Sequence, residues 1–302
     1  MAGQKLVGQN YTTPDLVAKV TGRAKYAEDY RADGMLFAKL LLSPMPHARV
    51  RHIDTSAALA MPGVKAILTA DDLPTPATGA ERALTNEPLY QGEPILAVAA
   101  VDELTAAEAI ERIDLDLEPL PFVVDPVESL RPGSANGRLE GNVWYPAAPA
   151  PPNSNGQPAR PQIKTLKWTP TDFAVEDDGK LPTGDAPEQW SYGDLDAGFK
   201  EAALVLDETF VVQSTGHQPM VTRTAMAYWQ NGKVYLHGST QSVARTVDPL
   251  ASWLNLDASN IVLISEYAGG GFGSKGAGAI SMAIPALLSN KANAPEMLHI
   301  TR

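Results

Sequence analysis

The sequence predicts an α+β fold in two folded parts that are separated by a proline-rich stretch. Strand-like and helix-like runs alternate from Gly22 to Pro126, prolines are dense after Tyr145, and a strand-rich region follows Tyr192. With 302 residues and 44% apolar content, the chain can bury a large core. We expect a first domain over residues 15–130, a linker or surface-wrapping segment over 131–195 and a second domain over 196–302.

The first domain is expected to be a compact α/β unit. Short apolar or alternating runs predict strands over residues 36–42, 49–53, 64–69, 94–100 and 113–117. Good helix formers predict helices over residues 55–60 and 102–113, and the second helix opens with acidic residues that suit a helix N-terminus. Asp114, Asp116 and Glu118 could be mistaken for an acid/base or metal cluster, but alternation along a strand places them on one solvated face.

The stretch between the two domains is rich in proline. Six prolines occur within 16 residues, at positions Pro146, Pro149, Pro151, Pro152, Pro158 and Pro161. Because proline has no backbone N–H and a fixed φ, this stretch cannot continue a helix or a central strand. We therefore expect a linker or an extended surface segment.

The second domain is expected to be β-rich. Asn231-Gly232 is a preferred pair for a type I′ turn, and the apolar runs on either side of it predict a hairpin over residues 224–237. Apolar periodicity predicts a helix over residues 243–254 despite Pro249. Further strands are predicted over residues 204–212 and 260–266, and a further helix over 278–289.

The most informative stretch is the loop Gly-Gly-Gly-Phe-Gly-Ser-Lys at Gly269 to Lys275, which lies between a predicted strand and a predicted helix. Glycine lacks a Cβ, so four glycines within five residues allow positive φ and let successive N–H groups converge on an anion or an oxo group. Phe272 can then project into a pocket as an apolar wall. A loop of this kind is suited to pressing its backbone against a ligand.

Two other interpretations of this loop compete with a ligand site of that kind. It could simply turn the chain, although so many glycines are costly in backbone entropy. It could also bind a nucleotide, because residues 271–276 formally satisfy G-x-G-x-x-G. A dinucleotide fold would need several further strands after the motif, and a Walker A loop would need Gly before Lys275 and Ser or Thr after it.

The loop resembles the molybdenum-cofactor loop of the xanthine dehydrogenase/aldehyde oxidase family of molybdenum hydroxylases. Ser239-Thr240-Gln241-Ser242 resembles the other cofactor-contacting turn of that family, and His217-Gln218-Pro219-Met220 with Arg223 resembles the segment before it. Upstream, residues 21–26, 43–50 and 92–98 resemble its small α/β hammerhead domain. The resemblance covers nearly the whole chain except the proline-rich middle. It implies a hammerhead domain followed by a mixed α/β molybdopterin-binding domain.

The resemblance also implies roles for residues of the two loops. Gln241 lies at a strand-to-helix junction, where a polar side chain most often serves as a local cap. By resemblance, its amide hydrogen-bonds the apical oxo ligand of molybdenum. Gly270, Gly271, Phe272 and Gly273 are implied to contact the cofactor, and Phe272 is also implied to be a wall of the substrate site. No side chain of this chain is implied to bind the metal directly.

The remaining candidates are expected to be structural. His217 could act as a ligand or a base, but the matching segment of the family is mainly structural. Arg223 is expected to form a charge pair, and Lys275 to hold the shape of the loop. His47 and Arg49 lie in the hammerhead region, where we expect a packing or interface role.

The chain departs from the family pattern in three ways. Gly276 stands where purine-oxidising members carry Glu, so xanthine is not expected to be the substrate. Val221 stands where many members carry Glu, which removes a carboxylate from the local network. The glutamate that acts as the general base lies near the distant C-terminus of the family's subunit, so no residue here is expected to take that role. We expect one part of a split molybdenum subunit or a fragment of a longer one.

The reaction implied by the resemblance is oxidative hydroxylation of a heteroaromatic or aldehyde substrate, with water as the oxygen source. The expected cofactor is molybdopterin with molybdenum, in the cytosine dinucleotide form. The expected partners are the rest of the molybdenum subunit, a small subunit with [2Fe-2S] clusters and a subunit with FAD. A non-catalytic scaffold subunit of such a complex and a nicotinamide-dinucleotide-binding dehydrogenase are the alternatives.

Composition limits the other possibilities. A net charge of -11 and a pI near 4.9 argue against nucleic acid as a partner, because a nucleic-acid surface needs clustered Lys and Arg. The chain has no Cys, so it can supply neither a disulfide nor the ligands of an iron–sulfur cluster. No apolar run suggests a signal peptide or a membrane span. We expect a cytoplasmic protein.

Overall fold

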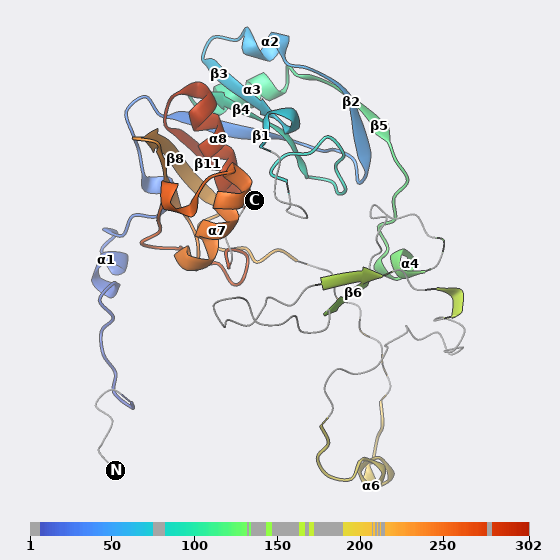
Figure 1. Cartoon of the computed structure of the whole chain (residues 1–302). Coiled ribbons are helices and arrows are strands. Elements are labelled where there is room, and N and C mark those ends of the chain that lie inside the picture. Colours follow the sequence, from blue (N-terminus) through green and yellow to red (C-terminus); the bar gives the residue numbers. More distant parts are fainter. Residues whose placement is uncertain are drawn as a thin grey trace. The chain divides into compact units, whose positions relative to one another are not determined.

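The computed structural model describes residues 7–74, 82–131, 133, 143–146, 163–166, 169–171, 190–206, 208, 210, 212, 215–276 and 280–301. The chain divides into two compact units (Figure 1). The first unit combines Met1–Leu120 with His217–Arg302, and the second is Pro121–Gly216. The first unit therefore draws on both of the domains that the sequence predicts.

Within the described residues, seven strands of the first unit form one sheet in the order β10-β9-β8-β11-β1-β4-β3. These strands are β10 (Ile261–Ile264), β9 (Lys233–Gly238), β8 (Thr224–Gln230), β11 (Glu296–His299), β1 (Leu36–Leu42), β4 (Pro94–Ala100) and β3 (Val64–Thr69). β11 pairs antiparallel with β8 and parallel with β1. It thus joins strands from the two ends of the chain into a continuous sheet.

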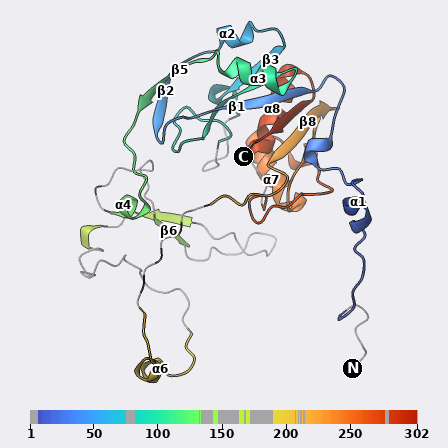
Figure 2. The same cartoon turned by 180° about the vertical axis from the view of Figure 1, so that it is seen from behind.

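Helices cover both faces of this sheet (Figures 1 and 2). On one face, α8 (Ala283–Ala292) buries Ile284 and Leu288 against Ala97 and Ala99 of β4. On the other, α2 (Ser56–Leu59) and α3 (Glu103–Ile110) pack on the alternate residues of β4, among them Val98. α7 (Val243–Leu254) packs beside α8 and β10. The alternation of β4 between two apolar cores explains why its residues from Ile95 to Ala100 are fully buried.

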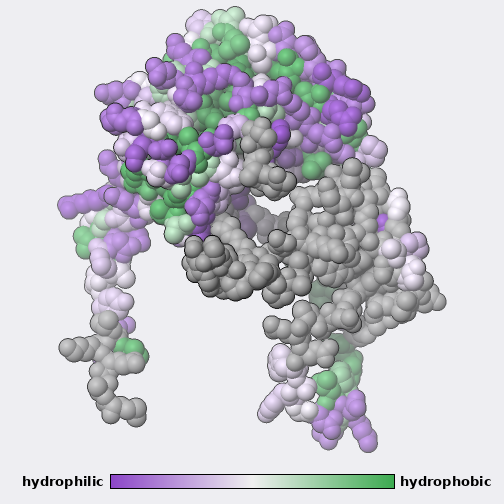
Figure 3. All heavy atoms as spheres, viewed as in Figure 1, coloured by the Kyte–Doolittle hydropathy of each residue, from purple (hydrophilic) through white to green (hydrophobic). Residues whose placement is uncertain are grey.

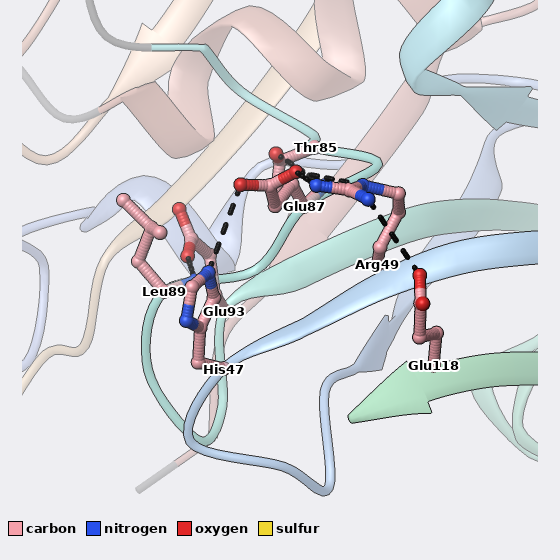
Figure 4. A network of polar contacts seen from close by, with 7 residues as sticks. All are labelled: His47, Arg49, Thr85, Glu87, Leu89, Glu93 and Glu118. Carbon is pink, nitrogen blue, oxygen red and sulfur yellow. Dashed lines mark hydrogen bonds and ion pairs between the residues drawn. The ribbon is translucent and has the colours of Figure 1, made fainter. Parts of the chain in front are cut away.

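The first unit also contains a second, two-stranded sheet, which has charged residues on both of its strands. β2 (Ala48–Asp54) pairs antiparallel with β5 (Asp114–Pro119). Arg49 donates through Nε and Nη2 to Glu87 Oε2, at 3.0 Å each, and its Nη1 lies 3.6 Å from Glu118 Oε2 (Figure 4). His47 Nε2 lies 3.6 Å from Glu87 Oε1. Glu118 thus belongs to an ion-pair network that ties β2 to β5 and to the segment around Glu87.

Smaller elements complete the described residues. The first unit also contains α1 (Leu16–Val20) and short 3₁₀ helices at Ala27–Asp29, Ala70–Asp72, Ala258–Asn260 and Ile280–Met282. The second unit contains α4 (Pro126–Leu130), α6 (Leu195–Glu201) and a two-stranded antiparallel sheet of β6 (Val143–Pro146) and β7 (Ile163–Leu166). This short sheet was not predicted, and most of the proline-rich residues lie outside the described part of the chain. Among the described residues, no helix combines the length and hydrophobicity that crossing a bilayer requires.

Two predicted elements of the second domain differ from the structure. The described residues within 204–212 belong to no strand, and Leu204, Phe210 and Val212 are exposed. Their pattern suits a strand, but no described strand pairs with them. The apolar surface of α6, with Leu195 and Phe199 exposed, precedes this segment (Figure 3). The predicted helix 278–289 is displaced: α8 begins at Ala283 and ends at Ala292, and Asn293 follows it as a left-handed C-cap with φ of 50°.

The predicted hairpin is present as β8 and β9, and its turn yields a stability prediction. Asn231 and Gly232 both have positive φ, 52° and 74°, as a type I′ turn requires. No atom lies within 4 Å of a Cβ built on Gly232, so the cost of Gly232→Ala is confined to the backbone. We expect this substitution to lower the free energy of unfolding by about 1 kcal/mol in urea titrations. Gly198→Ala, also with open space but in a helix, should cause no loss; equal losses for the two variants would contradict the turn assignment.

Candidate functional site

Three segments of the first unit meet at one edge of the large sheet. β9 and β10 run parallel, so the loops that follow Gly238 and Ile264 leave the sheet at the same edge. The segment before β8 joins them, because Val221 N donates to Gly269 O at 3.2 Å. The predicted convergence of the Gln241 turn and the glycine-rich loop is therefore seen in the structure.

The glycine-rich loop holds Gln241 by both its backbone and its side chain. Gln241 N donates to Lys275 O at 2.9 Å. The side-chain oxygen Oε1 accepts from Gly273 N at 3.0 Å and from Lys275 N at 3.3 Å. Two backbone N–H donors on one atom identify that atom as the amide oxygen. Among the described residues, Gln241 Nε2 has no hydrogen-bond partner, so the NH₂ group is free to donate to a ligand.

The absence of a Cβ at Gly271 makes room for this arrangement. A Cβ on Gly271 would lie 2.6 Å from Gln241 Cγ and closer still to the amide of the same side chain. The next residue, Phe272, has a φ of 53° and a side chain that is 72% exposed. A positive φ is unfavourable for a bulky residue, so the surrounding loop must hold Phe272 in this conformation. The aromatic ring of Phe272 therefore lies at the surface of the loop, outside the core.

Lys275 lies beneath the loop and is fully buried. Its Nζ donates to Val221 O and Ser239 Oγ, each at 2.6 Å, and to Ala268 O at 2.9 Å. Within the described part of the chain, no carboxylate lies within ion-pair distance of this ammonium group. Burial lowers the pKa of Lys275 to about 8, although three acceptors around the ammonium favour its charged form. A positive charge therefore lies directly under the loop.

A cavity of about 630 Å³ borders the loop. Its lining residues include Tyr26, Met220, Val221, Glu266, Tyr267, Gly269, Gly270 and Phe272. The rings of Tyr26 and Tyr267 are 5.7 Å apart, and Lys19 Nζ lies 5.9 Å from the centre of the Tyr267 ring. The volume suits a small organic ligand. Sequence reasoning missed Glu266 and Tyr267, for which adjacency to the loop was the available signal, and Lys19, which lies far from the loop in the sequence.

Of the two other candidates near β8, His217 lies beside the glycine-rich loop and Arg223 lines a different cavity. His217 Nε2 would be 3.3 Å from a Cβ on Gly273, so His217 is a direct neighbour of the loop. The charge pair predicted for Arg223 is wrong within the described residues, where its exposed guanidinium has no carboxylate within 4 Å. Arg223 instead lines a second cavity of about 320 Å³ with Lys39 and His299.

Comparison with known proteins identifies the family. Residues 21–121 match the family model of the aldehyde oxidase and xanthine dehydrogenase a/b hammerhead domain, and residues 178–302 match that of the molybdopterin cofactor-binding domain. The chain belongs to the molybdenum hydroxylase family. The resemblance inferred from the loop motifs is thus confirmed, as is the fold class of a hammerhead domain joined to a molybdopterin-binding domain.

Other molybdenum hydroxylases resemble the chain over most of its length. The carbon monoxide dehydrogenase large chain of Afipia carboxidovorans is 33% identical, covering 84% of this chain and 30% of that protein. The nicotine 6-hydroxylase large subunit of Paenarthrobacter nicotinovorans is 30% identical, covering 90% of this chain and 30% of that protein. The crystal structure of quinoline 2-oxidoreductase from Pseudomonas putida 86 superposes with a TM-score of 0.72 at 22% identity, covering 99% of this chain and 35% of that one. This chain spans about a third of the length of these relatives.

The residues at the loop fit the cofactor that a molybdenum hydroxylase binds. Molybdopterin and its metal present anionic and oxo oxygens, which accept hydrogen bonds. The site offers the free NH₂ of Gln241 as a donor, and the buried ammonium of Lys275 has no carboxylate beside it among the described residues. A neighbouring cavity of about 630 Å³ provides room for an organic group. A cation under the loop and a donor on it favour an anionic group of this kind.

Proposed function

We propose that this chain is part of the molybdenum-cofactor-binding subunit of a hydroxylase. In this proposal the complex oxidatively hydroxylates a heteroaromatic or aldehyde substrate, with water as the oxygen source. Because the chain spans about a third of its relatives' length, the rest of the molybdenum subunit must come from a further segment or a second chain. That portion would also supply the general base. The observation that carries the proposal is the clamp on Gln241 Oε1, which leaves the amide NH₂ free beside the glycine-rich loop.

The loop residues have distinct roles in this proposal. Gln241 would donate a hydrogen bond from Nε2 to an oxo oxygen of the cofactor, while Gly270, Gly271 and Gly273 would bring the backbone close to the cofactor. Phe272, whose ring is exposed, forms a wall of the substrate site and contacts the cofactor. The bound cofactor supplies the redox chemistry, and the chain supplies binding, orientation and hydrogen-bond donors. No side chain of this chain binds the metal directly in this proposal.

The substrate class rests on the loop and on two relatives. Nicotine 6-hydroxylase and quinoline 2-oxidoreductase have heteroaromatic compounds in their names, which supports a heteroaromatic substrate here. Gly276 carries no carboxylate that could hold a purine ring, so we do not expect a purine substrate. A small ring could lie against Phe272 by stacking or edge contact.

The proposal also covers the subunits that carry electrons away, the form of the cofactor, the cellular location and the domain boundaries. The chain has no Cys, so [2Fe-2S] clusters must be on a partner subunit, and FAD on another. We propose the cytosine dinucleotide form of molybdopterin and a cytoplasmic location. We further propose a hammerhead domain over residues 15–130, a connecting segment over 131–195 and the first part of the molybdopterin-binding domain over 196–302. The shared sheet implies that these two domains are closely joined.

The decisive experiment is to measure molybdenum per chain in a native, untagged complex together with everything that co-purifies. We expect about one molybdenum per chain, and release of cytidine monophosphate after acid hydrolysis. Release of a different nucleotide, or of none, would contradict the cytosine dinucleotide form of the cofactor but would leave the proposed hydroxylase function intact. A complex with intact partner subunits and no molybdenum would indicate the non-catalytic scaffold instead.

A further inference from the structure

Lys275 connects three separate segments of the chain through one buried atom. Its Nζ donates to Val221 O in the segment before β8, to Ser239 Oγ after β9 and to Ala268 O at the start of the glycine-rich loop. Ser239 Oγ in turn donates to Ala268 O at 2.6 Å. Each of the three ammonium protons therefore has an acceptor, and Val221 and Ser239, which supply two of the acceptors, are buried. The side chain fixes where these three segments lie relative to one another.

The backbone of the same residue holds Gln241. Lys275 O accepts from Gln241 N at 2.9 Å and from Thr240 Oγ1 at 3.2 Å, while Lys275 N donates to Gln241 Oε1 at 3.3 Å. Gly273 N, two residues before, adds the shorter bond to Oε1. The orientation of the Gln241 amide thus depends on the position of the backbone at residues 273–275. That position depends in turn on the Lys275 side chain.

We infer that Lys275 is a positioning residue that sets which end of the Gln241 amide faces the bound cofactor. With Oε1 held by the loop, the amide must present its NH₂ outward. Without the ammonium anchor, the backbone at residues 273–275 can shift, and the amide can rotate to present its oxygen instead. An oxygen facing the oxo groups of the cofactor is repelled, so the cofactor is held less tightly. This inference rests on the proposed function, because Gln241 has this role only if the cofactor binds at the loop.

Neither of the usual substitutes can replace lysine at this position. Arginine carries the same charge, but its planar fork cannot place three donors on acceptors that surround a single point. Methionine matches the length of the side chain and fills the same space, but it has no donor for the three acceptors. Lys275→Met is therefore the variant that removes the anchor with the least change in packing.

The test is a double-mutant cycle in the whole complex, with Lys275→Met, Gln241→Ala and both together. The quantity measured is the rate at which molybdenum is lost during dialysis, followed by metal analysis. We expect each single variant to lose molybdenum about tenfold faster than the wild type. In the Gln241→Ala background, Lys275→Met should change the rate by less than twofold, because the amide it positions is already gone. Effects that multiply to about a hundredfold would overturn the inference.

A spectroscopic readout separates positioning from general damage. The molybdenum–oxo stretching band, measured by resonance Raman on the metal that remains bound, should shift in Lys275→Met as it does in Gln241→Ala. An unshifted band in Lys275→Met would contradict the inference. Lys291→Met is the matched control, since among the described residues Lys291 donates only to Asp72, on the surface, at 2.7 Å. It should leave both the band and the rate of loss unchanged.

Two further points keep the outcome interpretable. If Lys275→Met does not fold, Ser239→Ala removes one of the three acceptors and keeps the ammonium. Its smaller increase in molybdenum loss should likewise disappear in the Gln241→Ala background, and persistence there would overturn the inference. A wild-type complex without molybdenum would instead refute the proposed function. The two failures are therefore distinguishable.

Discussion

Gly271→Ala should remove most of the activity of the complex while leaving the fold intact. The new Cβ would overlap the Gln241 side chain, which is flexible and can move away, whereas it meets no backbone atom among its nearest neighbours. The displaced amide would lose its bonds to Gly273 N and Lys275 N. Since the loss of one preorganised donor in an active site typically costs a hundredfold or more in turnover, we expect a loss of about a hundredfold.

The measurement is turnover of a heteroaromatic or aldehyde compound, the substrate class of the proposed function, together with the melting temperature. Gly276→Ala is the matched control in the same loop, because its Cβ would meet Gly273 O at 3.3 Å, a contact that a shift of a few tenths of an ångström relieves, and would have no atom of Gln241 within 4 Å. We expect Gly276→Ala to keep most of the turnover, and both variants to melt within about 2 °C of the wild type. If Gly271→Ala retains full turnover, the position of the Gln241 amide does not matter for the reaction.

Glu296→Gln should abolish a pH dependence of stability that the wild type shows. Glu296 lies in the central strand β11 with no exposed surface, and neither carboxyl oxygen has a hydrogen-bond partner among the described residues. Burial raises the pKa of this carboxyl from 4.5 to about 9. The folded state therefore keeps a proton that the unfolded state releases above pH 4.5. Stability falls as pH rises between these two values, by up to about 1.4 kcal/mol per pH unit.

Urea titrations at pH 5, 6, 7 and 8 measure this effect. The wild type should lose stability steadily over the series, whereas Glu296→Gln should be nearly flat and should exceed the wild type at pH 8. Glu108→Gln is the control, since Glu108 is exposed on α3 and should leave the slope unchanged. Parallel curves for the wild type and Glu296→Gln would mean that the carboxyl is ionised in the folded state.

Local signals in the sequence predicted the local structure well. The Asn-Gly turn, the periodicity of residues 243–254 and the alternation of residues 113–117 were sufficient to place β8, β9, α7 and β5. The two loops of the candidate site could also be placed together, because each follows a strand. Their family resemblance added the identity of the group that we propose they bind.

What could not be predicted depends on contacts between residues far apart in the sequence. Nothing in Glu296–His299, with a glutamate and a histidine at its ends, indicates the central strand of a sheet. The segment 204–212 has the composition of a strand, but a strand also requires a partner, which the described residues do not supply. The ion pair predicted for Arg223 is likewise missing among the described residues, because several of the side chains that line its cavity come from β1 and β11, which are distant in the sequence.

The place of β11 between β8 and β1 also governs the order in which the molecule can fold. β1 pairs with a strand that lies more than 250 residues later in the chain, so a ribosome completes nearly the whole described sequence before this pairing is possible. Until then, β1 and β8 each present an unpaired edge during synthesis, and such edges favour aggregation. The sheet around β1 thus cannot be completed until β11 has been synthesised. We expect the nascent polypeptide to be prone to aggregation up to that point and to benefit from chaperones.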